Sequence, residues 1–285
     1  MRLDALAALL PPPEAGDGPD AALPIAEAVR RELVEFDAGD VRLQQELLNL
    51  AGFECAVDGD RGPKTRGRTA LFQRKTGLPS TGQYDEPTFR ALVLPIVEAC
   101  ALPDASRGAR GAVFGAGRSH AAAKARELPP NLGPWVRLFM AGYEGASWPW
   151  CAGFASFVWI QAAAAVAAQG GRADAVERAR RYRSFSCDVI AQRAIEDGRF
   201  VSGHYVYNGQ EAILPGDLFL VQSRKGDWVH VGIVGAVRNG GREIGTIEGN
   251  TNAGGSREGL YVLERNRRVT AARYSGLDFV RCPFA

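Results

Sequence analysis

The sequence predicts an α+β protein made of two bodies, and three observations support this class. The chain has 285 residues, which exceeds the usual size of a single domain. Residues 40–102 carry apolar side chains at helical spacing, whereas residues 215–252 form short apolar segments separated by Gly-containing turns. Residues 103–130 are rich in Gly, Ala and Pro and read as a linker. We therefore expect a small all-α body, then a larger body at 131–285 in which a cysteine-bearing helix packs on an antiparallel sheet.

Residues 1–39 are predicted to form an acidic, Pro-containing N-terminal arm, with a short helix at 23–36. Residues 1–40 carry three basic and nine acidic side chains, whereas the whole chain has a formal charge of +2, so the remainder is about +8. A mildly basic body suits an anionic polymer such as cell wall, although ordinary surface solubility explains it equally well. The arm could dock onto a secretion machine or be a disordered tail.

Charge and hydropathy narrow the class of partner and the compartment. A formal charge of +2 gives no case for nucleic acid as a partner. No stretch is expected to span a membrane, and residues 1–13 lack the basic start, long apolar core and cleavage site of a secretory signal. We therefore expect synthesis in the cytoplasm without a signal peptide.

The first body is predicted to contain three helices with no room for an active site. Leu43, Leu47 and Leu48 form an apolar stripe, a second helix contains Phe72, and Asp85 caps a third helix. The pattern resembles the three-helix peptidoglycan-binding domain of wall hydrolases, and the residues that carry the resemblance are Val41, Leu43, Gln44, Leu47, Asp58, Gly59, Thr65, Phe72, Gln73, Gly77, Leu78, Gly82 and 88–92. The resemblance implies binding of bacterial peptidoglycan; simple docking onto the second body is the alternative.

Cys151 is the candidate nucleophile of the second body. It follows Pro149 and opens an apolar, Ala-rich helical stretch, so it lies at a helix N-terminus, where the helix dipole stabilises a thiolate. Trp148 and Trp150 flank it and could line a substrate groove. The other four cysteines show no metal-ligand spacing and are interpreted as small buried hydrophobes: Cys55, Cys100, Cys187 and Cys282.

Three predicted strands supply the candidate base. They cover about 218–222, 228–237 and 243–250, with a turn at Asn239-Gly240-Gly241. A turn centred on Gly240 places His230, Glu248 and Asn250 on one face of the sheet, with Gly232 leaving space between them. A two-residue turn would instead send Glu248 and Asn250 to the other face. The remaining histidines, His120 and His204, are interpreted as surface or structural.

The second body resembles the CHAP group of papain-like amidases and endopeptidases. The matching residues are Asn131, Gly133, Pro134, Val136, Trp150, Cys151, Ala152, Phe154, 215–217, 230–234 and 248–252. This resemblance implies a papain-like fold and a Cys151–His230 pair steered by Glu248, with Asn250 as assistant or alternate third member. It implies cleavage of an amide in the wall peptide, either at muramic acid or within the stem or cross-bridge. Clustered acidic residues that could hold calcium are not seen, so we expect no metal and no cofactor.

These resemblances imply a peptidoglycan hydrolase, either a phage-type endolysin or a secreted antibacterial effector, acting in the periplasm or cell wall after release or injection. Secretion machinery and an immunity or inhibitor protein are then expected partners. Two alternatives stay open: a catalytically silent wall-binding or structural protein, and a cysteine amidase toxin that acts on a protein amide. The sequence does not fix which amide is cut or the oligomeric state.

Overall fold

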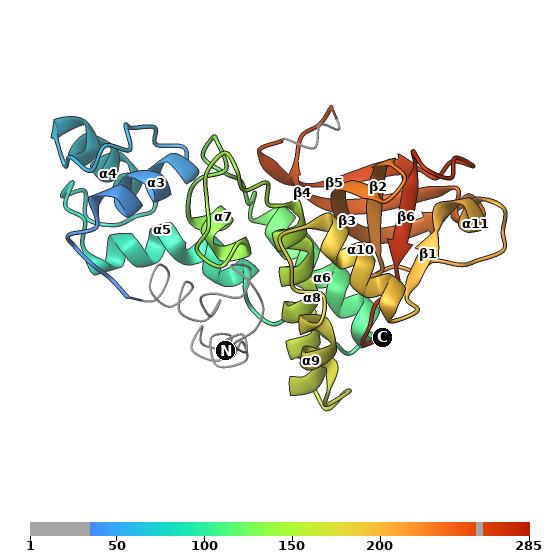
Figure 1. Ribbon diagram of the computed structural model, residues 1–285. Coiled ribbons are helices and arrows are strands. Elements are labelled where there is room, and N and C mark those ends of the chain that lie inside the picture. Colours follow the sequence, from blue (N-terminus) through green and yellow to red (C-terminus); the bar gives the residue numbers. More distant parts are fainter. Residues whose placement is uncertain (1–34, 255–258) are drawn as a thin grey trace.

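A computed structural model describes residues 35–254 and 259–285 (Figure 1). The expected helix at 23–36 and nearly all of the acidic arm lie outside these residues. The described chain is a mixed α+β structure with a helical body at one end and a sheet at the other (Figure 1). This arrangement confirms the α+β class and the order of the two bodies along the chain.

The helical body contains the three predicted helices, α3 (Val41–Leu50), α4 (Pro63–Lys75) and α5 (Glu86–Ala99). The Asp85 carboxylate accepts from the Thr88 backbone N–H at 3.0 Å, as expected for the cap of α5. Gln45 is buried and organises the loop after α3, because its Oε1 accepts from the backbone N–H groups of Asp58 and Gly59. The Asp-Gly turn of the sequence pattern is therefore held by a core glutamine.

The segment predicted as a linker contains a helix, α6 (Gly108–Ala122), which packs on the main helix of the second body. His120 lies on its buried face and is fully enclosed, with Nε2 2.9 Å from Gln161 Oε1. His120 is thus a structural histidine of the core and not a surface one. Part of the predicted linker is therefore a helix that packs on α8 and on α5.

The second body is built around α8 (Cys151–Ala168), which lies beside the sheet (Figure 1). Its remaining helices are α7 (Pro134–Phe139), α9 (Ala175–Arg180), α10 (Cys187–Glu196) and α11 (Gly203–Tyr207). By length and composition α8 could cross a membrane, with a mean hydropathy of 1.7, which corrects the expectation that no stretch would qualify. However, 89% of it is buried within the protein, as in a central core helix.

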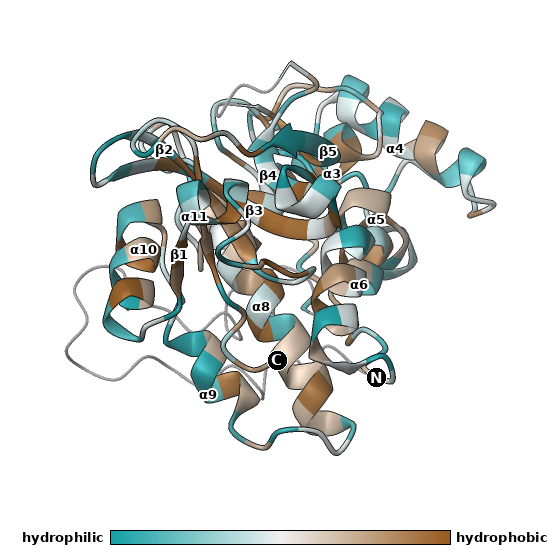
Figure 2. Cartoon of the chain, turned by 90° about the vertical axis from the view of Figure 1, so that its right-hand side faces the viewer, coloured by the Kyte–Doolittle hydropathy of each residue, from teal (hydrophilic) through white to brown (hydrophobic). Residues whose placement is uncertain are grey.

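The sheet has six antiparallel strands in the order β1-β6-β2-β3-β4-β5. Apolar residues concentrate on the central strands and hydrophilic ones on β5 at the edge (Figure 2). The strands are β1 (Phe200–Ser202), β2 (Leu218–Arg224), β3 (Asp227–Arg238), β4 (Glu243–Thr251), β5 (Tyr261–Arg268) and β6 (Leu277–Val280). The three predicted strands correspond to β2, β3 and β4.

The β3–β4 hairpin reaches the predicted register by a different route. Next to the turn, Arg238 pairs with Glu243 and Val237 with Ile244, one position away from the register expected for a turn centred on Gly240. A bulge between Val234 and Ala236 restores the expected register, so that Ile233 pairs with Ile247. The bulge therefore decides which side chains of β4 face His230.

The two bodies contact each other through polar side chains. Arg137 of α7 pairs with Glu46 of α3 at 2.6 Å, and both side chains are largely buried. Gln161 of α8 donates to the backbone carbonyls of Ala99 and Ala101 at the end of α5, both at 2.8 Å. These contacts fix the end of the helical body against the helix that carries Cys151.

Candidate catalytic centre

Cys151 is the first residue of α8 and is 4% exposed. The helix starts here in close contact with α7, because Gly153 lies against the Phe139 carbonyl and the Met140 sulfur, where a Cβ would fit at only 2.7 and 2.4 Å. The first N–H groups of a helix have no intrahelical acceptor. The Cys151 sulfur therefore lies at the positive end of a helix whose amides can also stabilise an oxyanion.

His230 of β3 and Glu248 of β4 form the predicted pair, with His230 Nε2 3.0 Å from Glu248 Oε2. Both side chains are buried, at 1% and 0% exposure. The other ring nitrogen, Nδ1, is buried and makes no hydrogen bond to the described residues. With Nε2 held by the carboxylate, Nδ1 is the nitrogen left for proton exchange with Cys151.

Glu248 is fixed from its far side by an arginine and a hydroxyl. Arg267 of β5 donates to both carboxylate oxygens, from Nε at 2.7 Å and from Nη2 at 2.6 Å, and Thr246 Oγ1 donates at 2.6 Å. Burial raises the pKa of Glu248, but Arg267 and then His230 outweigh it and hold that pKa well below its usual range. The carboxylate is thus ionised and locked in one orientation.

The protonation of the centre favours a thiolate–imidazolium pair. The pKa of Cys151 is lowered well below its ordinary value, first by a hydrogen bond from the Cys187 thiol and then by His230, against the effect of burial. Burial lowers the pKa of His230, but Cys151 and Glu248 together raise it to about 9. A buried pair with these shifts can supply a nucleophile and a general acid at neutral pH.

Asn250 does not approach the imidazole, which differs from the expected same-face arrangement. It has a positive φ of 55°, and the β4–β5 pairing is interrupted between Glu248 and Thr251. This left-handed backbone conformation directs the Asn250 side chain toward the start of α8. There its Oδ1 accepts from the Trp150 N–H at 3.2 Å. Its Nδ2 donates to the Gly259 carbonyl at 3.0 Å. Glu248 is therefore the group beside His230, and Asn250 positions the start of α8.

Two of the three predicted substrate-binding residues lie in the core. Trp150 is fully buried, donates from Nε1 to Glu127 at 2.6 Å and stacks on Phe139. Gly232 leaves no open space, because a Cβ there would fit only 2.7 Å from the Phe219 ring. Trp148 is partly exposed and stacks on Tyr143 at 4.5 Å, so it is the one predicted substrate residue that reaches the surface.

The structure adds three residues that the sequence did not indicate: Cys187, Glu127 and Arg267. Cys187, assigned only as a buried hydrophobe, has its sulfur 3.9 Å from that of Cys151. Glu127 contacts both Trp150 and Asn250 from within the expected linker. The serine before Cys187 was the available signal, since Ser186 caps α10 and puts this second cysteine at a helix start.

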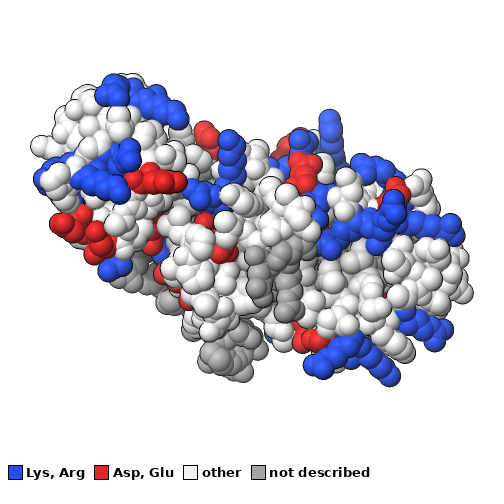
Figure 3. Space-filling model, turned by 90° about the horizontal axis from the view of Figure 1, so that it is seen from above, with Lys and Arg blue, Asp and Glu red and all other residues white. Residues whose placement is uncertain are grey.

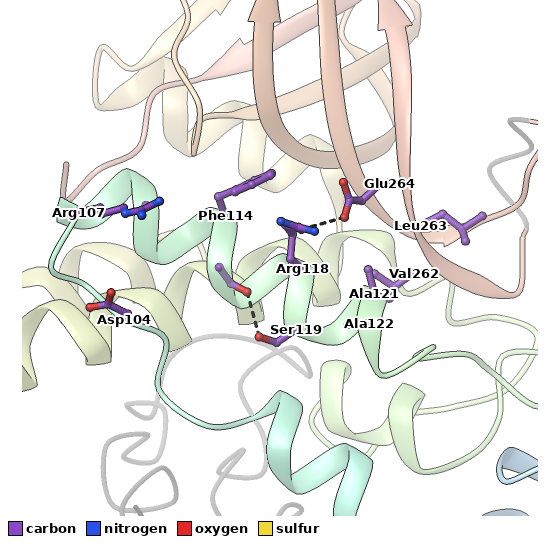
Figure 4. A pocket seen from close by; sticks show the side chains of 12 residues that line it. Asp104, Arg107, Phe114, Arg118, Ser119, Ala121, Ala122, Val262, Leu263 and Glu264 are labelled. Atoms are coloured by element: carbon purple, nitrogen blue, oxygen red, sulfur yellow. Dashed lines mark hydrogen bonds and ion pairs between the residues drawn. The ribbon is translucent and has the colours of Figure 1, made fainter.

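A surface groove with a volume of about 780 Å³ lies elsewhere, between α6 and β5 (Figure 4). Its charged groups include Arg118 and Glu264, which pair with each other at 3.0 Å (Figure 4). It contains neither Cys151 nor His230. In the described part of the chain, no three His, Cys, Asp or Glu side chains are grouped to hold a metal ion.

Lys and Arg side chains lie over both the helical body and the half of the molecule that contains the sheet (Figure 3). On the sheet half, β5 and the β3–β4 turn carry five arginines: Arg238, Arg242, Arg265, Arg267 and Arg268. The Arg267 guanidinium forms an ion pair with Glu248. The other four arginines lie at the outer edge of the sheet. They agree with the net positive charge expected for the chain after residue 40.

Comparison with a family of known proteins gives a match to the helical body. Residues 37–92 match the family described as "Putative peptidoglycan binding domain". The chain is 47% identical over 49 residues to the "Putative OxPP cycle protein OpcA" of Synechococcus elongatus, a match that covers 17% of this chain and 11% of that protein. No solved structure matches. The match supports a peptidoglycan-binding domain at residues 37–92, with peptidoglycan as a partner and an association with the cell wall.

Proposed function

We propose that this protein is a cysteine hydrolase that cleaves an amide bond of the peptidoglycan peptide, with the helical body holding the polymer. One arrangement carries the proposal: Cys151 at the start of α8 interacts with the buried His230 imidazole, which Glu248 orients at 3.0 Å. A nucleophile, a base and an orienting group in this order are the components of cysteine amide hydrolysis. The match of residues 37–92 supplies the substrate class.

In the proposed mechanism the Cys151 thiolate attacks the amide carbonyl, and helix-terminal N–H groups of α8 stabilise the oxyanion. His230, protonated at Nδ1, gives its proton to the departing amine, which leaves a thioester on Cys151. The neutral imidazole then takes a proton from water, whose hydroxide releases the acid product. Glu248 stays ionised throughout and stabilises the imidazolium.

The test is digestion of purified sacculi with mass analysis of the released muropeptides, because each candidate bond leaves a distinct product. Cys151→Ser and His230→Ala are each expected to abolish release while binding to sacculi and circular dichroism stay as in the unchanged protein. Retained release in either variant contradicts the assignment of the nucleophile or the base.

A catalytically silent wall-binding protein is the second candidate, favoured by the closure of the centre: Cys151 is 4% exposed and His230 1%. It predicts that the unchanged protein is retained on sacculi yet releases no new amines. The same experiment therefore separates the two functions, since only the hydrolase makes release depend on Cys151.

A further inference from the structure

We propose that Cys187 is a resolving cysteine, which forms a reversible disulfide with Cys151 when a low-molecular-weight disulfide reacts with the nucleophile. The catalytic centre is then also a thiol–disulfide exchange site. The inference starts from the 3.9 Å that separates the two sulfurs, both inside the protein and both free thiols in this structure.

The backbone brings these two sulfurs together at the ends of two helices. Cys151 is the first residue of α8 and Cys187 the first residue of α10, 36 positions later. Asp188, the next residue of α10, accepts from the Trp228 backbone N–H at 2.7 Å and so fixes α10 against the start of β3. A disulfide needs a sulfur separation of about 2 Å, so the sulfurs must approach by roughly 2 Å. Rotation of the two side chains about χ1 is a movement of this size.

The two thiols differ in the way that an attacking and a resolving cysteine must differ. The hydrogen bond between them lowers the pKa of Cys151 and raises the pKa of Cys187, so the first is the thiolate and the second keeps its proton. Thiolates are the species that attack disulfides. Burial raises the pKa of Cys100 and of Cys282 to about 12, so Cys151 and not one of these two supplies the thiolate for the first attack.

The reaction balances in two exchange steps. The Cys151 thiolate attacks one sulfur of the external disulfide, forms a mixed disulfide and expels a small thiolate, which takes the proton of the His230 imidazolium. Cys187 then loses its proton as its sulfur attacks the Cys151 sulfur, and the second small thiolate leaves with that proton. Two protein thiols are oxidised to one disulfide, and the external disulfide is reduced to two thiols.

The disulfide would remove the nucleophile, so any hydrolysis would stop until a reductant restores the thiols. This consequence rests on the proposed function, whereas formation of the disulfide does not. A mass measurement therefore tests the exchange chemistry even if the protein releases no muropeptide.

The experiment incubates the full chain with oxidised glutathione and follows intact mass and peptide maps. The unchanged protein is expected to lose two hydrogen atoms and to give a Cys151–Cys187 cross-linked peptide, which dithiothreitol reverses. Cys187→Ser is expected to stop at one glutathione on Cys151, and the matched control Cys282→Ser is expected to behave as the unchanged protein.

Two results would overturn the proposal. One is a stable glutathione adduct on Cys151 in the unchanged protein, since Cys187 would then fail to resolve it. The other is a mass and peptide map that stay unmodified. Where muropeptide release is measurable, the residual activity is expected to equal the reduced fraction, and reductant is expected to restore it fully.

Discussion

At the scale of single residues, the arrangement of the catalytic centre depends on the Glu248 carboxylate, which several side chains contact at once. Glu248 accepts from Arg267, Thr246 and His230 at once, and none of these contacts is exposed to bulk water to any large extent. A carboxylate held this way cannot rotate away from the imidazole. Its negative charge is therefore a fixed part of the field that keeps His230 protonated.

Glu248→Gln tests this role through the pH dependence of activity. The His230 pKa of about 9 lies above the ordinary 6.5, so the thiolate–imidazolium pair persists below pH 9 and is lost as pH rises through it. Removing the carboxylate removes an interaction that raises this pKa, so the alkaline limb of the kcat/KM profile is expected to move down toward pH 6.5.

Asn250→Ala is the control for that measurement, because Asn250 contacts the Trp150 N–H and not the imidazole. We expect a lower kcat, by roughly 100-fold if the nucleophile shifts by about 1 Å, with the alkaline limb still near pH 9. If both variants moved the limb equally, Asn250 and not Glu248 alone would act on His230.

How well the sequence predicted the site follows from this geometry. Strand alternation put His230 and Glu248 on one face, since faces repeat every second residue, but the register expected from the turn holds there only because of the bulge between Val234 and Ala236. The same rule failed for Asn250, because one left-handed residue breaks the alternation. Cys187 could not be found this way, since helix packing and not local pattern brings it to Cys151.

At the scale of elements, close backbone packing explains where α8 can start. Gly153 lets α8 approach the end of α7, where the Phe139 carbonyl also accepts from Arg183 at 2.7 Å. Pro149 and the apolar run after Cys151 indicated where α8 starts, and Gly-containing turns bounded the strands β2, β3 and β4. Strand β5 was not predicted, because its charge-rich sequence YVLERNRR is that of an exposed edge strand.

A pair of glycine substitutions tests this packing. Gly153→Ala is expected to lower the free energy of unfolding by about 2 kcal/mol, because a Cβ would overlap the Phe139 carbonyl and the Met140 sulfur. Gly67→Ala, in α4 with no atom within 4 Å of the new Cβ, is expected to raise it by about 0.5–1 kcal/mol through helix propensity. Urea titration followed by circular dichroism measures both; equal effects would contradict the steric account.

At the scale of the whole molecule, the helical body is tied to the α8 side of the second body. The sequence pattern identified the three-helix body but not α6, because a segment rich in Gly and Ala gives little amphipathic signal. That segment also contributes Glu127, which bonds Trp150 beside the nucleophile. The join between the two bodies is thus part of the support of the centre and not a free spacer.

The substitution Glu46→Gln tests the contact between the two bodies. The Arg137–Glu46 pair is partly shielded, with 15% and 12% of the side chains exposed, so its loss is expected to cost about 1 kcal/mol. In this variant Arg137 retains its ion pair with Glu144 at 2.8 Å, so the second body is expected to stay folded. Limited proteolysis between residues 100 and 107 is expected to become several-fold faster, by roughly the fivefold that 1 kcal/mol of local opening allows. An unchanged rate would show that the pair does not hold the bodies together.

The strand order of the sheet also bears on how the protein is made. Strand β6 is the last of the six along the chain, yet it lies between β1 and β2, and β1 pairs with β6 alone among the described strands. During translation, β2, β3 and β4 can emerge and pair before residues 277–280 leave the ribosome, but β1 has no partner until then. The β1 edge of the sheet is therefore completed only after synthesis of that segment. His230, Glu248 and Arg267 lie on β3, β4 and β5, so the groups that activate Cys151 leave the ribosome before β6 does.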